Sequence, residues 1–289
     1  MDQAEQLRII KANMQSRPLA RVITVTSGKG GVGKSNTAIN LAIQFRKMGQ
    51  RVIILDADFG LANIEIMFGA VPKHNLCDLI YQGKRINEII TWGPMDVGFI
   101  SGGSGIAGMS NLSRDYLMYI IKNLSELDSI ADIIIVDTGA GINDAVLEFL
   151  VASGEILLVT TPEPTSITDS SSLLKALYRH PRFREDITKV KMISNRVEKE
   201  AEGVVLFNKL NSVVTRYLKI PMTYLGSVPQ DNQLIKAVMQ QSPISIYNPA
   251  AKSSLAYETI AARLLDKEEE QRQPKRGMAA FFSHIVSGR

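Results

Sequence analysis

Residues 27–35 read Ser27-Gly28-Lys29-Gly30-Gly31-Val32-Gly33-Lys34-Ser35. An apolar run at 22–26 precedes them, and a helical pattern begins at Lys34. The glycines let backbone N–H groups turn inward around phosphate oxygens, and the helix N-terminus adds the positive end of its dipole. Residues 28–35 match G-x-x-x-x-G-K-[ST] in the strand–loop–helix context that this pattern requires. The sequence therefore predicts a triphosphate-binding loop, in which Lys34 reaches the β- and γ-phosphates and Ser35 ligates Mg²⁺.

The rest of the chain alternates short apolar runs with helical patterns. Candidate strands lie at 22–26, 52–55, 97–100, 133–136, 156–159, 190–193 and 223–226. Candidate helices lie at 34–48, 113–124, 167–178 and 204–217. This alternation predicts an α/β fold with a doubly wound, mostly parallel sheet flanked by helices on both faces. Ligands of such sheets bind at the carboxyl ends of the strands, where the polar motifs of this chain fall.

Composition narrows the function classes. The 289 residues carry a net charge of +4, which is too weak to indicate nucleic-acid binding by itself. Cys77 is the one cysteine, so a disulfide framework within the chain is excluded and a reducing, cytoplasmic setting is expected. The sequence has no secretory pattern and no apolar run long enough to span a bilayer, so any membrane contact is expected to be peripheral.

Lys29 is a second lysine, early in the loop. The string 29–34 resembles the deviant Walker A motif of the MinD/ParA class of P-loop ATPases, and the resemblance covers about residues 20–265. It implies an ATP-bound homodimer in which Lys29 crosses the interface to the phosphates of the partner's nucleotide. The alternative is a solvated surface lysine.

Three aspartates follow predicted strands. Asp56 and Asp58 are two residues apart on an extended strand end, so their side chains point the same way. The resemblance implies that Asp58 assists hydrolysis and that Asp56 helps with the metal. Asp137 ends an apolar strand in the Walker B form, and one water-mediated aspartate suffices for Mg²⁺. Because no side chain looks like a strong base, ATP hydrolysis is expected to be slow.

Two further strand ends resemble the family's adenine-contacting segments. The amide of Asn195 is expected to pair with the adenine edge, Pro229 to pack on the ring, and the backbone near Gln230 to bond its polar rim. The backbone N–H of Asn36 can serve the α-phosphate. The guanine-specific string Asn-Lys-x-Asp is absent. The expected ATP-binding residues are Gly28, Lys29, Gly30, Gly31, Val32, Gly33, Lys34, Ser35, Asn36, Asn195, Pro229, Gln230 and Asp231.

The N-terminus carries a second resemblance. Asp2, Gln3, Ala4, Leu7 and Arg8 match the D-Q-A-x-x-L-R signature of the flagellar number regulators called FlhG, YlxH or FleN. The match implies that this segment stimulates the GTPase of FlhF, a signal-recognition-type partner. An amide and a cation on a short helix could order the partner's attacking water and neutralise phosphate charge. The alternative is a polar tail without a function.

The C-terminus carries an apolar stripe at helical spacing, formed by Met278, Phe281, Phe282, Ile285 and Val286. Basic residues flank it, as in helices that lie in a membrane interface. The alternative is packing on the protein itself, and both are expected to hold: packing without ATP and membrane binding with it. The expected organisation is a partner-activating segment at 1–20, an ATPase domain at 21–265, a charged linker at 266–276 and an amphipathic helix at 277–289.

These features favour a regulatory ATPase switch that controls flagellar number or placement with FlhF and basal-body (C-ring) components. A MinD-like septum-positioning ATPase is the nearest alternative, and a ParA-like DNA-partition ATPase is a third. The weak net charge disfavours DNA partition. Reductase chemistry on a cluster shared by two chains is excluded, because one cysteine per chain cannot supply four thiolates.

Overall fold

The structure is a computed structural model that describes residues 19–58, 63–102, 123–218, 221–266 and 277–286. One twisted sheet of eight strands runs through its centre, in the order β3-β4-β2-β5-β1-β6-β7-β8. The strands are β1 (Arg21–Ser27), β2 (Val52–Ala57), β3 (Thr91–Trp92), β4 (Gly98–Ile100), β5 (Ile133–Ala140), β6 (Glu155–Thr160), β7 (Lys189–Val197) and β8 (Met222–Pro229). All neighbouring pairs are parallel except the edge pair β3–β4.

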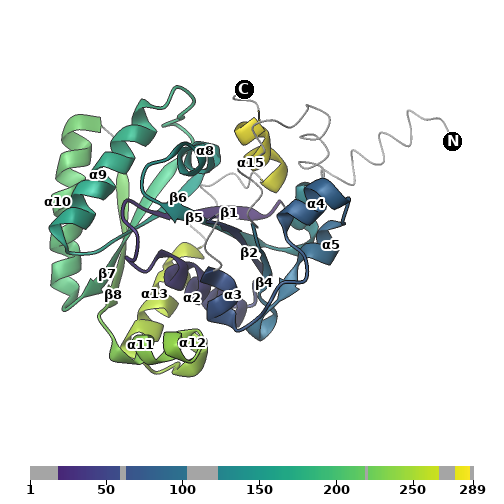
Figure 1. The fold of residues 1–289 in the computed structure, drawn as a ribbon. Coiled ribbons are helices and arrows are strands. Elements are labelled where there is room, and N and C mark those ends of the chain that lie inside the picture. Colours follow the sequence, from purple (N-terminus) through teal and green to yellow (C-terminus); the bar gives the residue numbers. More distant parts are fainter. Residues whose placement is uncertain (1–18, 59–62, 103–122, 219–220, 267–276, 287–289) are drawn as a thin grey trace.

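Helices cover both faces of the sheet (Figure 1). The longer ones are α2 (Lys34–Lys47), α8 (Asp144–Ala152), α9 (Pro164–Arg179), α10 (Glu200–Leu218), α11 (Asn232–Met239), α13 (Lys252–Leu264) and α15 (Gly277–Val286). The shorter ones are α3 (Asn63–Phe68), α4 (Leu76–Gln82), α5 (Ile86–Ile89), α7 (Leu127–Ile130), α12 (Ile244–Tyr247) and the 3₁₀ turn η1 (Pro94–Asp96). The predicted doubly wound, mostly parallel α/β fold is confirmed.

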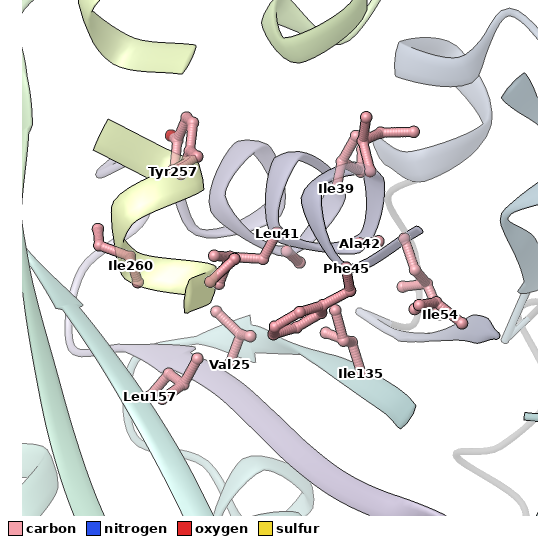
Figure 2. Close-up of a cluster of buried hydrophobic side chains, with 14 of the residues drawn as sticks. Val25, Ile39, Leu41, Ala42, Phe45, Ile54, Ile135, Leu157, Tyr257 and Ile260 are labelled. Atoms are coloured by element: carbon pink, nitrogen blue, oxygen red, sulfur yellow. The ribbon is translucent and has the colours of Figure 1, made fainter. Parts of the chain in front are cut away.

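Both faces of the central strands are buried, which explains their continuous apolar runs. In β5, Ile133 and Ile135 pack in the core beneath α2 and α13, whereas Ile134 and Val136 pack in the core on the opposite face. Figure 2 shows the first of these cores, where Phe45 of α2 and Ile260 of α13 meet β-strand side chains. This packing fixes α2 on the sheet, and with it the loop that precedes α2.

All seven predicted strands are present, and β3 is an additional one. Two residues at the sheet edge are too short to produce a periodic signal, so β3 was not predicted. The helices predicted at 34–48, 167–178 and 204–217 correspond to α2, α9 and α10, and most of the one at 113–124 lies outside the described residues. No helix in the described part of the chain is long and apolar enough to cross a membrane.

Candidate functional site

The loop between β1 and α2 lies at the carboxyl end of the central strand, and its glycines are sterically required. A Cβ on Gly28 would lie 2.3 Å from backbone atoms of Asp169 and Ser170 in α9. Gly33 has φ +94°, and a Cβ there would lie 2.3 Å from Asn195 Nδ2. Asn195 Nδ2 donates to the Val32 carbonyl at 2.7 Å, so the end of β7 holds the loop from behind. The loop is therefore fixed in shape before any ligand enters.

A cavity of about 630 Å³ opens above this loop. Its lining residues are Ser27, Gly30, Gly31, Gly33, Lys34, Ser35, Asn36, Asp58, Ile66, Met67, Ala140, Arg196 and Val238. The volume is typical of sites for small molecules and cofactors. The loop residues and Asp58 line part of the cavity, and α3, α11 and the ends of β5 and β7 supply its remaining walls.

Lys34 occupies the centre of an acidic group at the base of the cavity. Its Nζ donates to Asp137 Oδ1 at 2.9 Å and lies 3.9 Å from Asp58 Oδ2. Asp56 and Asp137 are direct neighbours in the β2–β5 register, which explains why they meet beside the loop. The amine of Lys34 thus neutralises carboxylates that would otherwise repel a phosphate group.

The pKa values of Asp56 and Asp58 are shifted by their surroundings. Burial, and next the charge of Asp137, raises the pKa of Asp56 to about 7. Burial also raises the pKa of Asp58, against the lowering effect of Lys34. The side chain of Asp58 is partly exposed, whereas that of Asp137 is fully buried. Of the three, Asp58 alone lines the cavity, and it is therefore the carboxyl group best placed to face a reacting water.

Unpartnered buried atoms test whether a nucleotide and Mg²⁺ fit. Within the described residues, Asp137 Oδ2 and Asn195 Oδ1 are buried without a hydrogen-bond partner. Such orphaned oxygens are rare unless a ligand, ion or water completes them. Asp137 Oδ2 can accept from a metal-bound water, and Asn195 Oδ1 can accept from an exocyclic amine such as that of adenine. The residues present therefore fit both a nucleotide and Mg²⁺.

The described residues contain no group of three or more His, Cys, Asp or Glu side chains that could hold a metal by themselves. A Mg²⁺ ion at this loop would instead use the Ser35 hydroxyl, waters and phosphate oxygens, which is how Mg²⁺ is usually held beside nucleotides. Asp56 and Asp137 lie close enough to Lys34 to hold such an ion through bound waters.

Lys29 lies on the surface of its own chain. Its Nζ is 2.8 Å from both Glu163 Oε2 and Thr165 Oγ1, at the N-terminus of α9. The expected crossing to a partner chain would require this contact to break.

The residues expected to contact adenine lie next to the cavity or the phosphate loop without lining the cavity itself. Asn195 is buried against the loop, as described above. Pro229 is partly buried and Gln230 is exposed, with the Gln230 N–H donating to the Val197 carbonyl at 2.9 Å. Asp231 caps α11 through Gln233 N and also accepts from Ser253 N and Oγ. Asp231 therefore positions the end of β8, and none of these four residues lines the cavity.

Five residues outside the predicted site do line it: Ile66, Met67, Ala140, Arg196 and Val238. Ile66, Met67 and Val238 lie on helices that no phosphate motif marks, so only the tertiary fold brings them to the cavity. Arg196 follows Asn195 directly in the sequence, so the predicted role of Asn195 is the signal that could have identified it.

The C-terminal stripe packs on the protein itself in this structure. Met278, Phe281 and Phe282 are buried in the second core, and the Phe281 ring stacks on Phe149 of α8 with centroids 6.0 Å apart. Ile285 is partly buried. The expected partner-activating residues, Asp2 to Arg8, lie outside the described residues.

A profile of the ParA family, described as NUBPL iron-transfer P-loop NTPase, matches residues 18–265. The chain belongs to this family. The predicted MinD/ParA membership is therefore confirmed, and P-loop NTPases of the ParA/MinD family are ATPases. Iron transfer does not follow for this chain, because Cys77 gives a dimer two thiolates rather than four.

Two ParA-family relatives match almost end to end. The antiactivator FleN of Pseudomonas aeruginosa is 38% identical over 273 residues, covering 94% of this chain and 96% of FleN. The flagellum site-determining protein YlxH of Helicobacter pylori is 30% identical, covering 99% of this chain and 96% of YlxH.

Solved structures support the fold. MinD of Aquifex aeolicus, in a complex with MinC, has a TM-score of 0.67 at 22% identity, covering 86% of this chain and 96% of that one. MinD of Pyrococcus horikoshii, complexed with Mg-ADP, has a TM-score of 0.67 at 21% identity, covering 88% and 99%.

Proposed function

We propose that this chain is an ATP-dependent dimerising switch that regulates the number or placement of flagella. The observation that carries the proposal is the match to FleN over nearly the full length of both chains, and YlxH matches in the same way. The name of YlxH concerns the placement of flagella, and the D-Q-A-x-x-L-R signature links this chain to the same group of regulators, whereas the ATPase core alone is common to the wider family.

The geometry of the site supports ATP as the substrate. Lys34 is the group that would bind the β- and γ-phosphates, and the loop amides from Gly28 to Asn36 would surround the chain of phosphates. If Lys34 turned to the phosphates, Asp137 would lose its contact with Lys34 and would be able to accept from a water bound to Mg²⁺. Mg²⁺ bound at Ser35 would neutralise charge that develops on the phosphates.

Hydrolysis is proposed to be slow. Asp58 is the carboxyl group that faces the cavity and would orient the attacking water. Phosphoryl transfer depends mainly on positioning and charge stabilisation, so one oriented water and two lysines suffice without a strong base. A slow reaction suits a switch whose ATP state must persist long enough to act.

The dimer is proposed to form across the open cavity. Lys29 would leave Glu163 and reach the phosphates bound by the partner subunit, so each site would be complete only in the dimer. We further propose that the ATP state binds the cytoplasmic membrane surface through 277–289 and stimulates an FlhF-type GTPase through 1–20. C-ring components of the basal body are the remaining partners in this proposal.

Septum positioning is the second candidate. The MinD homolog of Arabidopsis thaliana, described as a septum site-determining protein, is 28% identical over 276 residues. The identity to FleN is ten percentage points higher, which favours the flagellar role. DNA partition has no comparable support from the charge of the chain.

Electron microscopy of cells carrying Lys34→Ala in place of the natural chain tests the proposal. We expect the number or placement of flagella per cell to change while septum position and DNA content stay normal. Lys175→Ala, an exposed lysine on α9, is the matched control and should leave flagella unchanged. Misplaced septa with normal flagella would support the MinD-like role instead, and DNA loss would support partition.

A further inference from the structure

Asp128 contacts residues from both ends of the chain. It lies in the first turn of α7, and its Oδ1 accepts from Met278 N at 2.9 Å, at the start of α15. The same carboxylate accepts from the backbone N–H of Ala20, the residue directly before β1. One side chain from the middle of the sequence therefore holds the start of β1 and the start of α15 together.

The hydrogen bond between Asp128 and Ala20 lies under α15, which packs on β1 and α8 (Figure 1). Ala20, Met278 and Phe282 are buried in the same apolar core. Burial raises the pKa of Asp128, against the lowering effect of the two N–H donors. Because hydrogen bonds shielded from water are stronger than exposed ones, undocking of α15 would weaken the bond to Ala20.

A polar contact also holds the other end of α15. Arg182 donates to the His284 carbonyl at 2.6 Å and pairs with Glu148 of α8. The helix has ten residues, and isolated helices of this length are marginal in water. We therefore expect α15 to leave the core as a whole, taking Met278 away from Asp128.

Ala20 is the position at which the expected partner-activating segment, residues 1–20, joins the sheet. The next residue, Arg21, is held by the sheet independently of α15, because its N–H donates to the Asp132 carbonyl at 2.9 Å. The preceding residue, Leu19, is exposed. Ala20 is therefore the point at which α15 can act on the N-terminal segment without disturbing β1.

We propose that Asp128 couples the N-terminal segment to α15, so that undocking of α15 at a membrane loosens Ala20 and lets residues 1–20 reach a partner. The inference rests on the proposed roles of 277–289 and 1–20 and adds the link between them. It makes stimulation of the partner GTPase depend on membrane binding, since both follow from the same helix leaving the same core.

Amide hydrogen exchange at Ala20, followed by NMR in the full-length chain, tests the link. Phe281→Asp combined with Phe282→Asp expels α15, because two carboxylates cannot stay buried in an apolar core. We expect exchange at Ala20 to rise about 10-fold or more, the factor that corresponds to losing a hydrogen bond to a charged group. Protected amides in β5 would show that the sheet stays folded. Unchanged exchange at Ala20 in this variant would overturn the proposal.

Asp128→Ala shows whether the effect passes through the carboxylate. Exchange at Ala20 should rise by a similar factor, and adding Phe281→Asp and Phe282→Asp should raise it little further. Additive increases would mean that α15 only covers Ala20, and Asp128 would then have no coupling role. Glu126→Gln, which removes an exposed carboxylate at the N-cap of α7, is the matched control and should exchange like the wild type.

The GTPase of an FlhF-type partner reports the consequence. Without membranes, the full-length chain carrying Phe281→Asp and Phe282→Asp should stimulate it severalfold more than the full-length wild type does. Equal stimulation by the two chains would overturn the coupling. If neither this variant nor a peptide of residues 1–20 stimulates the GTPase, the proposed function fails, whereas the exchange rates at Ala20 still decide whether Asp128 links the two ends.

Discussion

Lys29 Nζ lies 2.8 Å from Oε2 of Glu163 in the same chain, the residue that immediately precedes α9. The pair is solvent-exposed, with 36% of the lysine side chain and 51% of the glutamate side chain accessible. Exposed pairs of this kind hold their partners weakly and are screened by salt. Glu163 therefore keeps Lys29 close to its own cavity with a contact that a partner's phosphates can outcompete.

Glu163→Gln is expected to shift the chain toward the dimer when ATP is present, because Lys29 then loses the charge that retains it. Lys29→Ala should remove ATP-dependent dimers and leave nucleotide binding by the monomer intact. Analytical ultracentrifugation with and without ATP measures both. Lys175→Ala on the same helix is the control for a lost surface charge. Dimers that persist in Lys29→Ala would exclude a crossing role for this lysine.

A peptide of residues 1–20 is expected to raise GTP hydrolysis by a purified FlhF-type GTPase severalfold. The reason is that Gln3 and Arg8 supply an amide and a cation of the kind that order water and neutralise phosphate charge. Phosphate release gives the rate. A matched peptide with Gln3→Ala and Arg8→Ala is the control, and equal rates with both peptides would show that these side chains do not act on the GTPase.

Much of the site could be predicted because its motifs are local. The triphosphate loop, Asp58 and Asp137 each follow a strand that the apolar pattern marks, and parallel strands bring their carboxyl ends together. Asn195 lies at the end of β7, directly behind the phosphate loop, and its predicted contact with adenine stays a prediction. The sequence cannot show that its amide nitrogen holds the Val32 carbonyl, because that contact joins residues 163 positions apart.

Other features depend on information that no short pattern carries. The bulge of β7 at Arg196 arises from the registers of two strands, and Val238 reaches the cavity only through the packing of α11. The C-terminal stripe illustrates a different limit. An apolar helix face can pack against a protein core or insert into a membrane interface. The spacing from Met278 to Val286 therefore predicted the helix but could not show which of the two it contacts.

Gly277→Ala is expected to loosen α15 from the core. Gly277 has φ +65°, and a Cβ there would lie 2.4 Å from Asp128 Oδ2, which is part of the carboxylate that accepts from Met278 N. Burial of Met278, Phe281 and Phe282 stabilises the docked helix by roughly 2 kcal/mol each. If residues 277–289 bind membrane as proposed, the protein core and the membrane compete for the same side chains. In the absence of ATP, a larger fraction of the Gly277→Ala protein than of the wild type should therefore sediment with anionic liposomes.

Gly49→Ala is the matched control for this experiment, since Gly49 has φ +86° with open space around a Cβ. It imposes the same kind of backbone strain far from α15 and should leave liposome binding unchanged. If Gly277→Ala also leaves it unchanged while hydrogen exchange shows α15 released, residues 277–289 do not bind membrane.

The buried group of Arg21, Glu155 and Lys191 is expected to set the acid limit of stability. Burial acts to raise the pKa of Glu155, but the hydrogen bonds and charges of Arg21 and Lys191 outweigh it and lower the pKa below 4.5. A lowered carboxyl pKa stabilises the fold above the unfolded pKa, and this stabilisation is lost as pH falls through the folded pKa. The free energy of unfolding should therefore fall steeply below about pH 4.5.

Glu155→Gln should cost about 3 kcal/mol near neutral pH, because two buried cations lose their counter-charge. Its free energy of unfolding should also fall less steeply at acid pH than that of the wild type, since the titrating group is gone. Urea unfolding between about pH 3 and pH 7 measures both effects. Asp186→Asn, which removes the acidic partner of the exposed Arg184–Asp186 pair, is the control and should follow the wild-type curve. If the free energy of unfolding fell equally steeply with pH in Glu155→Gln and in the wild type, a different carboxyl group would govern acid unfolding.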